Sequence, residues 1–260
     1  PAATAKNVVV VGAGPAGLEA ARVAAERGHS VTLYEKKGSV GGLLEFANNV
    51  KGPHENLSVL RSYFERQMEV LGVNVMLNTE ATADIIAEAS PDIVIAATGG
   101  VRDTLGLSDT AGTKVVGIDD FMMADIAEEV VIVGSNVQAI DAAMYLLAQG
   151  KHVQVVTPNA ASAIGAGHSF WVKTFTQPNM KALGVRFWPE ATVTAVNDGS
   201  VTVKTATGIE QEIACGTVVE ALDCLPNDSL STGLSCEVVT VGDAARPFNI
   251  GEAICSGNAA

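Results

Sequence analysis

The chain has 260 residues, of which 48% are hydrophobic and 5% aromatic. This length allows one large or two modest domains, and the composition fits an α/β core built from Val, Ala, Ile and Leu. The formal net charge of −13 argues against a nucleic-acid or anionic-membrane surface, because both require clustered Lys and Arg. The apolar runs are too short to span a bilayer and no secretory signal is recognisable. We therefore expect a soluble, cytoplasmic protein.

The two ends of the chain suggest a piece of a longer polypeptide. The sequence starts at Pro1 without an initiating Met, and it stops at Ala260 inside an expected helix that lacks a capping residue. We expect further sequence on at least one side.

The stretch from 8 to 35 is the most informative part of the chain. A run of Val predicts a strand buried on both faces of a parallel sheet. It is followed directly by glycines in G-x-G-x-x-G spacing, namely Gly12, Gly14 and Gly17. These permit a tight turn, close approach of a pyrophosphate and close helix packing, in that order. Glu35 ends the next strand about 20 residues on, where a carboxylate can accept both hydroxyls of a ribose.

This stretch therefore predicts a dinucleotide site with the phosphates at a helix N-terminus. The alternative is a glycine-rich turn in an ordinary parallel sheet. The following residues, 36–56, are rich in Gly, Asn and Pro and predict a loop over the ligand. Within it, Gly41 and Gly42 either bring the backbone close to the cofactor or form a plain turn.

The next segments complete one βα, βα, β pattern. Apolar residues at helical spacing predict a helix from Leu57 to Leu71, stopped by Gly72 before a strand at 73–77. A short helix at 85–88 then precedes a buried strand that runs into a Thr-Gly-Gly turn at 98–100. This is the content of one dinucleotide-binding half.

A second unit begins at Lys114 and repeats the first in outline. Residues 128–158 again predict strand, turn, helix and strand. In the second turn, the positions of the three glycines hold Gly134, Asn136 and Ala139. The second strand ends in Thr157, so neither an acid for a ribose nor an Arg for a 2′-phosphate follows it. A working nicotinamide site and a structural relic both remain open.

The rest of the chain returns to the first unit. Alternating β-branched residues at 187–214 predict a hairpin or meander around an Asn-Asp-Gly turn at 197–199, and 218–227 predicts a strand with an exit. A strand at 237–241, which we expect to complete the first sheet, leads to Gly242 and Asp243, and a helix follows from about Gly251. Asp243 either bonds a sugar or phosphate-linked hydroxyl or serves as an N-cap or turn residue.

The cysteines offer no redox pair and no metal site. Cys215, Cys224, Cys236 and Cys255 form no C-x-x-C motif and no zinc spacing with the four histidines. We expect buried free thiols. A disulfide reductase of the thioredoxin reductase type therefore lacks its central feature here.

Taken together, several motifs resemble the two-dinucleotide-binding-domain flavoprotein fold. They are GAGPAG with Glu35, AATGG at 96–100, the degenerate second turn, PN at 226–227 and VGDAARPFNIGEAI at 241–254. More narrowly, the chain resembles the C-terminal FAD/NAD(P)-binding half of the iron–sulfur flavoenzymes related to 2,4-dienoyl-CoA reductase, enoate reductase and trimethylamine dehydrogenase. The resemblance covers essentially the whole chain.

The resemblance implies an α/β fold of two Rossmann-like domains, the second inserted into the first. The FAD-binding domain would comprise residues 1–110 and 226–260, and the NAD(P)H-binding-like domain residues 111–225. It also implies a partner, an N-terminal TIM-barrel half of the same polypeptide that carries FMN and a 4Fe-4S cluster and is absent from this chain. The full-length form is a possible homo-oligomer.

The resemblance further implies which residues meet the cofactors. Those expected to bind FAD are Gly12, Gly14, Pro15, Ala16, Gly17, Glu35, Lys36, Gly42, Leu43, Ala81, Thr98, Gly99, Gly242, Asp243, Ile250 and Ala253. Those expected at a nicotinamide site are Gly134, Asn136, Val137 and Asp141, the last matching an acidic residue of nicotinamide-using relatives. No catalytic residue and no metal ligand is assigned.

Two functions follow from this resemblance. In the first, the chain is the FAD-binding module of an NAD(P)H-dependent, ene-reductase-like enzyme, and passes electrons from NADH or NADPH through FAD to the barrel. In the second, suggested by the damaged motif around Asn136, it is a non-catalytic, ADP-holding module as in trimethylamine dehydrogenase. The sequence does not choose between NADH and NADPH, nor does it name the final substrate.

Overall fold

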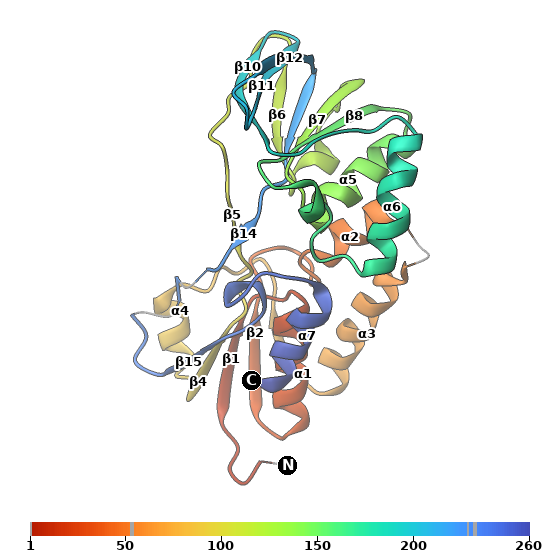
Figure 1. Cartoon of the computed structure of the whole chain (residues 1–260). Helices are drawn as coiled ribbons and strands as arrows, with labels where there is room; N and C mark the ends of the chain where they lie inside the picture. The colour runs from red at the N-terminus through yellow and green to blue at the C-terminus, as the bar shows by residue number, and fades with distance from the viewer. Residues whose placement is uncertain (1, 53–54, 228, 231–232) are drawn as a thin grey trace. The chain divides into compact units, whose positions relative to one another are not determined.

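A computed structural model describes residues 2–52, 55–227, 229–230 and 233–260 of the chain. It divides into two compact units, the first formed by Pro1–Val101 with Cys224–Ala260 and the second by Arg102–Asp223. The chain leaves and re-enters the first unit through β5 (Val101–Arg102) and β14 (Cys224–Leu225), which pair in a two-stranded sheet (Figure 1).

The first unit is built on a five-stranded sheet in the order β15-β4-β1-β2-β3. Every neighbouring pair in it is parallel. The strands are β1 (Asn7–Val11), β2 (Ser30–Tyr34), β3 (Asn74–Met76), β4 (Ile93–Ala96) and β15 (Glu237–Thr240). The last strand thus returns to the first sheet, as the sequence predicts. Parallel strands place their carboxyl ends along one edge, where α/β proteins bind ligands.

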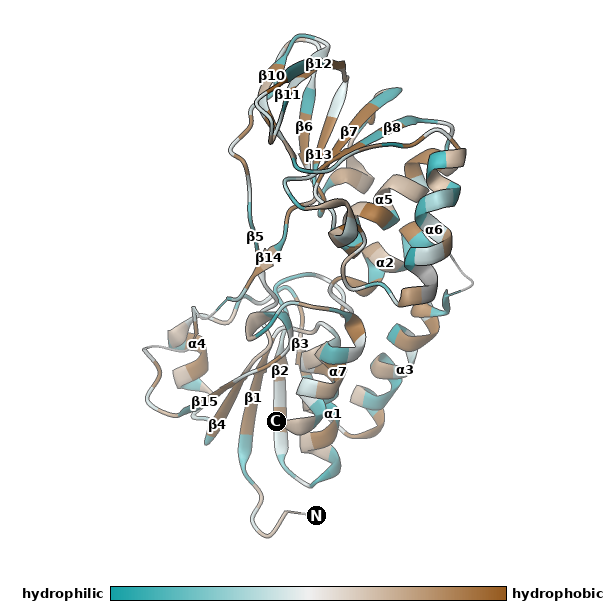
Figure 2. Ribbon diagram, viewed as in Figure 1, coloured by the Kyte–Doolittle hydropathy of each residue, from teal (hydrophilic) through white to brown (hydrophobic). Residues whose placement is uncertain are grey.

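Helices cover this sheet and bury its apolar strands. They are α1 (Pro15–Glu26), α2 (Leu44–Lys51), α3 (Leu57–Val70), α4 (Ala83–Glu88) and α7 (Ile250–Ala259). Figure 2 shows β1 and β4 coloured as hydrophobic, and Val9, Val10 and Val94 are fully buried. The continuous Val run is therefore the centre of the core, because both faces of β1 lie under side chains.

The second unit repeats this plan. Its five-stranded sheet has the order β6-β13-β7-β8-β9, all parallel. The strands are β6 (Lys114–Gly117), β7 (Glu129–Val133), β8 (His152–Val156), β9 (Arg186–Trp188) and β13 (Thr217–Glu220). Two helices, α5 (Val137–Ala148) and α6 (Phe170–Ala182), accompany it. A three-stranded antiparallel sheet, β10 (Ala191–Asn197), β11 (Ser200–Thr205) and β12 (Glu210–Ala214), adds a second layer.

Three short 3-10 helices complete the described elements. They are η2 (Phe121–Met123), η3 (Ala161–Ala163) and η4 (Gly242–Ala244). Among the residues that the structure describes, no helix has the length and apolar character needed to cross a membrane.

The structure differs from the sequence-based expectations in four places, one of which, α6, lies where no element was expected. The segment predicted as a loop contains α2, whose Leu44, Phe46 and Ala47 are buried; two of its other residues, Pro53 and His54, lie outside the described part. The helix α6 was not predicted, because Pro178 inside it interrupts the helical signal. The meander starts at Ala191, since Phe187 belongs to β9, which pairs parallel with β8.

The fourth correction concerns the thiols. None of the four cysteines, all of which are described, forms a disulfide; only Cys215 is buried, whereas Cys224 and Cys236 are partly exposed and Cys255 is exposed. Burial raises the pKa of the Cys215 thiol to about 11. The prediction of buried thiols therefore holds for one residue and is wrong for the other three.

Candidate functional site

The first glycine turn has the close packing that its sequence predicts. Gly12 has φ +102°, a left-handed conformation that favours glycine, and its amide donates to the Tyr34 carbonyl at 2.8 Å. A Cβ on Gly12 would collide with the Ala97 carbonyl oxygen, and one on Gly17 with the Gly12 carbonyl oxygen. These two positions therefore accept only glycine, and they hold α1 tightly against β1 and β4.

Gly14 differs from these two because it faces open space. It is the N-cap of α1, and a Cβ on it would have no neighbour within 4 Å among the described atoms. No side chain of the described residues caps α1, and Pro15 occupies its first turn without an amide hydrogen to lose. The first-turn N–H groups of an α-helix have no partners within the helix. They and the positive end of the helix dipole thus face the space in front of Gly14, which suits an anionic group.

Glu35 lies beside this turn and is almost completely buried, with 8% of its surface exposed. One carboxylate oxygen, Oε2, accepts the Ala13 amide at 2.8 Å, and the other, Oε1, accepts the Lys37 amide at 2.8 Å. The backbone therefore fixes the carboxylate at the end of β2. Each oxygen keeps lone-pair capacity for a further donor, such as a ribose hydroxyl.

The loop after β2 lies against the same turn. The Gly41 amide donates to the Ala13 carbonyl at 2.8 Å, and a Cβ on Gly42 would come within 3.0 Å of the Gly14 Cα. Gly42 itself has φ +54°. Of the two readings of this glycine pair, close approach to the cofactor cradle is the one that the geometry favours.

Thr98 follows β4 and carries an unusual group. Its hydroxyl oxygen is buried and, within the described part of the chain, has no hydrogen-bond partner. The Thr98 Cα lies close to Gly12, because a Cβ on Gly12 would come within 3.3 Å of it. Gly99 follows with φ +73° and open space around it. A buried hydroxyl without a partner is costly, so this one marks a place where a ligand can bond.

The last strand brings Gly242 to the start of α1. A Cβ on Gly242 would come within 2.6 Å of the Ala16 Cβ and within 3.8 Å of the Ala253 Cβ, and its amide donates to the Ser256 hydroxyl at 2.8 Å. The next residue, Asp243, accepts the Phe248 amide at 3.3 Å through Oδ1. Sequence reasoning did not identify Ser256, whose hydroxyl orients this turn.

The helix α7 packs against α1 along its length. Gly257 permits this contact, because a Cβ there would collide with the Ala16 carbonyl oxygen. The Asn258 amide donates to Glu19 Oε1 at 2.7 Å, and Arg22 donates to the same carboxylate, which lowers the pKa of Glu19. These contacts fix the C-terminal end of α7 against α1, while Asn249 caps its start, accepting the Glu252 amide at 2.9 Å.

The other residues expected at the FAD site have less specific surroundings. Lys36 is exposed and follows Glu35, Leu43 is the N-cap of α2, and Ile250 begins α7. Ala81 packs into a small apolar cluster with Tyr34 and Val94. The structure thus groups the glycine turn, Glu35, Gly42, Thr98 and Gly242. It gives no specific contact that separates the four residues of this paragraph, Lys36, Leu43, Ile250 and Ala81, from ordinary structural residues.

The second turn has the same backbone framework, but the side chain of Asn136 fills the space that is open at Gly14. Gly134 has φ +140°, and a Cβ on it would collide with the Ala221 carbonyl oxygen, as the corresponding atom on Gly12 would with Ala97. Asn136 is the N-cap of α5, and its Oδ1 accepts the Ala139 amide at 3.0 Å. Its Nδ2 donates to the carbonyls of Ala221 at 3.0 Å and Leu222 at 3.1 Å. The chain therefore caps this helix itself.

The remaining predicted residues of the second turn are held within the protein. Asp141 is buried and lies 3.4 Å from His168 Nε2, and Val137 is the half-buried first residue of α5. Thr157, where the first unit has Glu35, is fully buried and accepts the Asn159 amide at 3.2 Å. The Gly165 amide donates to the Ser135 carbonyl at 2.6 Å, so the loop after β8 lies across the turn.

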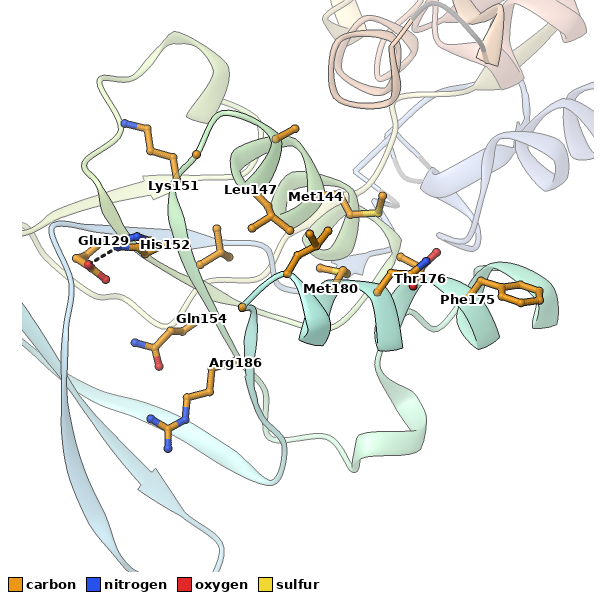
Figure 3. A pocket seen from close by; sticks show the side chains of 16 residues that line it. Glu129, Met144, Leu147, Lys151, His152, Gln154, Phe175, Thr176, Met180 and Arg186 are labelled. Carbon is orange, nitrogen blue, oxygen red and sulfur yellow. Dashed lines mark hydrogen bonds and ion pairs between the residues drawn. The ribbon is translucent and has the colours of Figure 1, made fainter.

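A cavity of about 830 Å³ lies elsewhere in the second unit, between α5, α6 and β8 (Figure 3). Its lining includes Met144, Leu147 and Met180, and His152 pairs with Glu129 at 2.7 Å on its border. His152 begins β8, so the cavity lies at the amino edge of the sheet. Ligands of such sheets bind at the opposite, carboxyl edge, and the cavity is therefore separate from the second turn.

These features test which cofactors the chain fits. The open space at Gly14, the uncapped α1 and the unpartnered Thr98 hydroxyl fit the diphosphate of a dinucleotide such as FAD in the first unit. In the second unit, the Asn136 side chain occupies the corresponding position, so the fit is poor. Among the described residues, no group of three or more His, Cys, Asp or Glu side chains could hold a metal ion.

Comparison with known proteins identifies related chains. The family described as pyridine nucleotide-disulphide oxidoreductase matches residues 6–242. The chain is 39% identical over 157 residues to an NADH oxidase of Thermoanaerobacter brockii and 38% identical over 153 residues to a cinnamate reductase of Clostridium sporogenes. Each alignment covers 58% of this chain and about a quarter of the relative, 24% and 23% respectively.

A solved structure is similar over nearly the whole chain. The 2-naphthoyl-CoA reductase structure superimposes with a TM-score of 0.87 at 34% identity, covering 99% of this chain and 40% of that one. The chain thus spans well under half the length of the relatives it matches, and these are flavoenzymes of the group that its motifs resemble. The family whose model matches the chain is one whose members bind FAD and a pyridine nucleotide. The chain belongs to the pyridine nucleotide-disulphide oxidoreductase family.

Proposed function

We propose that the chain is the FAD-binding module of a larger flavin-dependent oxidoreductase of the ene-reductase type. The observation that carries this proposal is the open first turn. There α1 has no side-chain cap, a Cβ on Gly14 would meet no atom within 4 Å, and the nearby buried Thr98 hydroxyl has no partner among the described residues. In the nucleotide-free chain the first-turn amides of α1 have no side-chain partner among these residues and the hydroxyl has none at all, which costs free energy for the buried hydroxyl. A bound diphosphate would supply the missing acceptors.

The residues divide the binding among them. The first-turn amides of α1 would hold the diphosphate, and Gly42 would close over it, because its backbone already lies against Gly14. Glu35, fixed by two backbone amides, would accept the adenosine ribose hydroxyls. Asp243 and the start of α7 would contact the ribityl segment and the flavin ring. When bound, FAD would supply the electron-transfer chemistry, since its isoalloxazine ring can be reduced and reoxidised.

The electron partner would lie outside this chain. The relatives are much longer, which supports a further half with its own cofactors. We propose that this half is the TIM barrel with FMN and a 4Fe-4S cluster that the motifs imply, and that it carries the final substrate. The functional assignment of residues 1–110 and 226–260 to FAD, and of 111–225 to a nicotinamide-domain fold, is part of the same proposal.

A second function is favoured by one observation, the self-capped second turn at Asn136. Without a nicotinamide site, the same first turn would serve a non-catalytic module that holds ADP. The ADP portion of FAD and free ADP would use the same Glu35 and α1 contacts, so these contacts do not separate the two functions.

The nucleotide that the protein carries separates them. We would purify the 260-residue chain, denature it and identify the released nucleotide by mass spectrometry, then incubate the emptied chain with FAD and record its visible absorbance. The FAD module predicts released or reconstituted FAD. Released ADP together with failure to take up FAD would support the structural module instead.

A further inference from the structure

The two units present equivalent turns, which can be compared atom by atom. Gly12 and Gly134 both have positive φ. A Cβ on either would meet the carbonyl oxygen just after the neighbouring strand of the sheet, Ala97 after β4 in the first unit and Ala221 after β13 in the second. This correspondence places Asn136 where the first unit has Gly14, at the N-cap of the helix.

The two N-cap positions differ in what fills the space before the helix. Beside Gly14 that space is open. At the second turn it holds a carboxamide, whose oxygen accepts the Ala139 amide and whose nitrogen donates to the Ala221 and Leu222 carbonyls at 3.0 and 3.1 Å. Since the middle glycine of the motif exists to let the backbone approach a pyrophosphate, this side chain stands in the place of the phosphates. It also consumes one of the amide donors that would bind them.

The charges near the second turn also disfavour a bound diphosphate. The Asp223 carboxylate lies 3.4 Å from Asn136 Nδ2, whereas the corresponding position of the first unit holds Gly99. A carboxylate at this distance opposes a diphosphate. The Arg102 guanidinium, which bonds Gln138 in the first turn of α5, is shared with the Asp119 carboxylate at 2.9 Å. The local cation is therefore already balanced by an anion.

We propose that Asn136 is a built-in occupant of the second dinucleotide cradle, and that it prevents this turn from binding the pyrophosphate of NADH or NADPH. The inference rests on the proposed function in one respect, namely that the first turn holds the flavin nucleotide. The sheet, the tight glycine and the helix of the second unit are all retained, so the Asn136 side chain is the main obstacle, to which the Asp223 carboxylate adds an unfavourable charge.

The test is a gain of binding in Asn136→Gly. We would titrate the FAD-loaded chain with NADH and with NADPH by isothermal calorimetry, which reports binding without turnover. The natural chain is expected to bind neither more tightly than about 1 mM, and the variant is expected to bind at least one of them about tenfold more tightly or better. Submillimolar binding by the natural chain, or unchanged binding by the variant, would overturn the proposal.

Two further variants keep the test decisive. Asn136→Asp retains an oxygen to cap α5 but adds a negative charge, so it is expected to remain unable to bind either nucleotide even when fully folded. Gly14→Asn places the same side chain in the first turn and is expected to lower FAD affinity by about tenfold or more. FAD content is measured before each titration, so a chain that takes up no FAD contradicts the proposed function, while its nicotinamide titration still tests Asn136. If Asn136→Gly is unstable by circular dichroism, the shorter Asn136→Ser is titrated in its place and must show tighter binding than the natural chain.

Discussion

At the scale of single residues, the most informative group is the Thr98 hydroxyl. Most buried polar atoms in folded proteins have a partner, and this one has none among the described residues. Glu35 is its opposite, because backbone amides already hold both of its oxygens. In the described part of the chain the Thr98 hydroxyl lacks a hydrogen-bond partner that a ligand could supply, whereas the Glu35 carboxylate is already held in position to accept a hydrogen bond from a ligand.

Thr98→Val tests the incomplete residue. Valine has the same shape but no hydroxyl, so the nucleotide-free chain should keep its free energy of unfolding or gain up to about 1 kcal/mol. FAD affinity should fall by about two- to tenfold, the worth of one hydrogen bond. Denaturant unfolding and FAD titration measure the two effects.

The matched control is Thr157→Val in the second unit. That hydroxyl is also buried, but it accepts the Asn159 amide, so its removal should destabilise the chain by about 1 kcal/mol and leave FAD affinity unchanged. Equal FAD affinity in the natural chain and Thr98→Val would show that the hydroxyl faces no ligand.

Cys215 makes stability depend on alkaline pH. Its pKa is raised by burial from 9.0 to about 11, so above pH 9 the unfolded chain loses this proton before the folded chain does. The folded chain then binds more protons, and the free energy of unfolding falls as pH rises, by roughly 3 kcal/mol once pH 11 is passed. Urea unfolding at pH 8 to 11 measures the loss, which Cys215→Ala should largely remove. An identical pH profile in that variant would refute the assignment.

At the scale of elements, the two turns show how much one position in a motif decides. Both retain the strand, the tight first glycine and the helix, and in both a Cβ on that glycine would meet the carbonyl oxygen just after the neighbouring strand, β4 or β13. They differ at Gly14 and Asn136, and that difference separates an open helix N-terminus from a closed one. Packing determines that a strand, a turn and a helix form at each site. Whether the helix N-terminus can bind an anion depends on whether the N-cap residue leaves its amides open.

Gly17→Ala and Gly14→Ala should have opposite consequences. A Cβ at Gly17 collides with the Gly12 carbonyl, so we expect a loss of about 1 to 3 kcal/mol in the free energy of unfolding of the empty chain. A Cβ at Gly14 meets open space, so stability should change by less than about 1 kcal/mol, while FAD affinity falls by about tenfold or more. Thermal unfolding without nucleotide and FAD titration separate the two. A Gly14→Ala chain that binds FAD normally would contradict the role of that space.

The same elements show what the sequence could and could not predict. The Val run, the glycine turn and the returning strand at 237–240 were predictable, because periodicity and glycine spacing are local signals. The helix α2 was not predictable, since the Gly and Asn residues around it indicate a loop. The helix α6 was not predictable either, since Pro178 disfavours a helix. The Asn136 Nδ2 atom donates to carbonyls 85 and 86 residues away, and no local pattern reveals these contacts.

At the scale of the whole molecule, two copies of one plan have diverged. Four strands follow the same order in both sheets, β4-β1-β2-β3 and β13-β7-β8-β9, whereas the outer strand comes last in the first unit (β15) and first in the second (β6). The first copy retains the geometry of a dinucleotide cradle, and the second retains the fold while filling the cradle itself. Because the chain covers only 40% of the 2-naphthoyl-CoA reductase structure, we propose that its electrons pass to or from a part that lies beyond it.

The central claim is that the first unit holds FAD, and the nucleotide that co-purifies with the chain tests it most directly. The account predicts FAD, released on denaturation at close to one molecule per chain, or taken up to that ratio when FAD is added to the emptied protein. A chain that takes up no FAD after it has been emptied, whether it released ADP or no nucleotide, would contradict it.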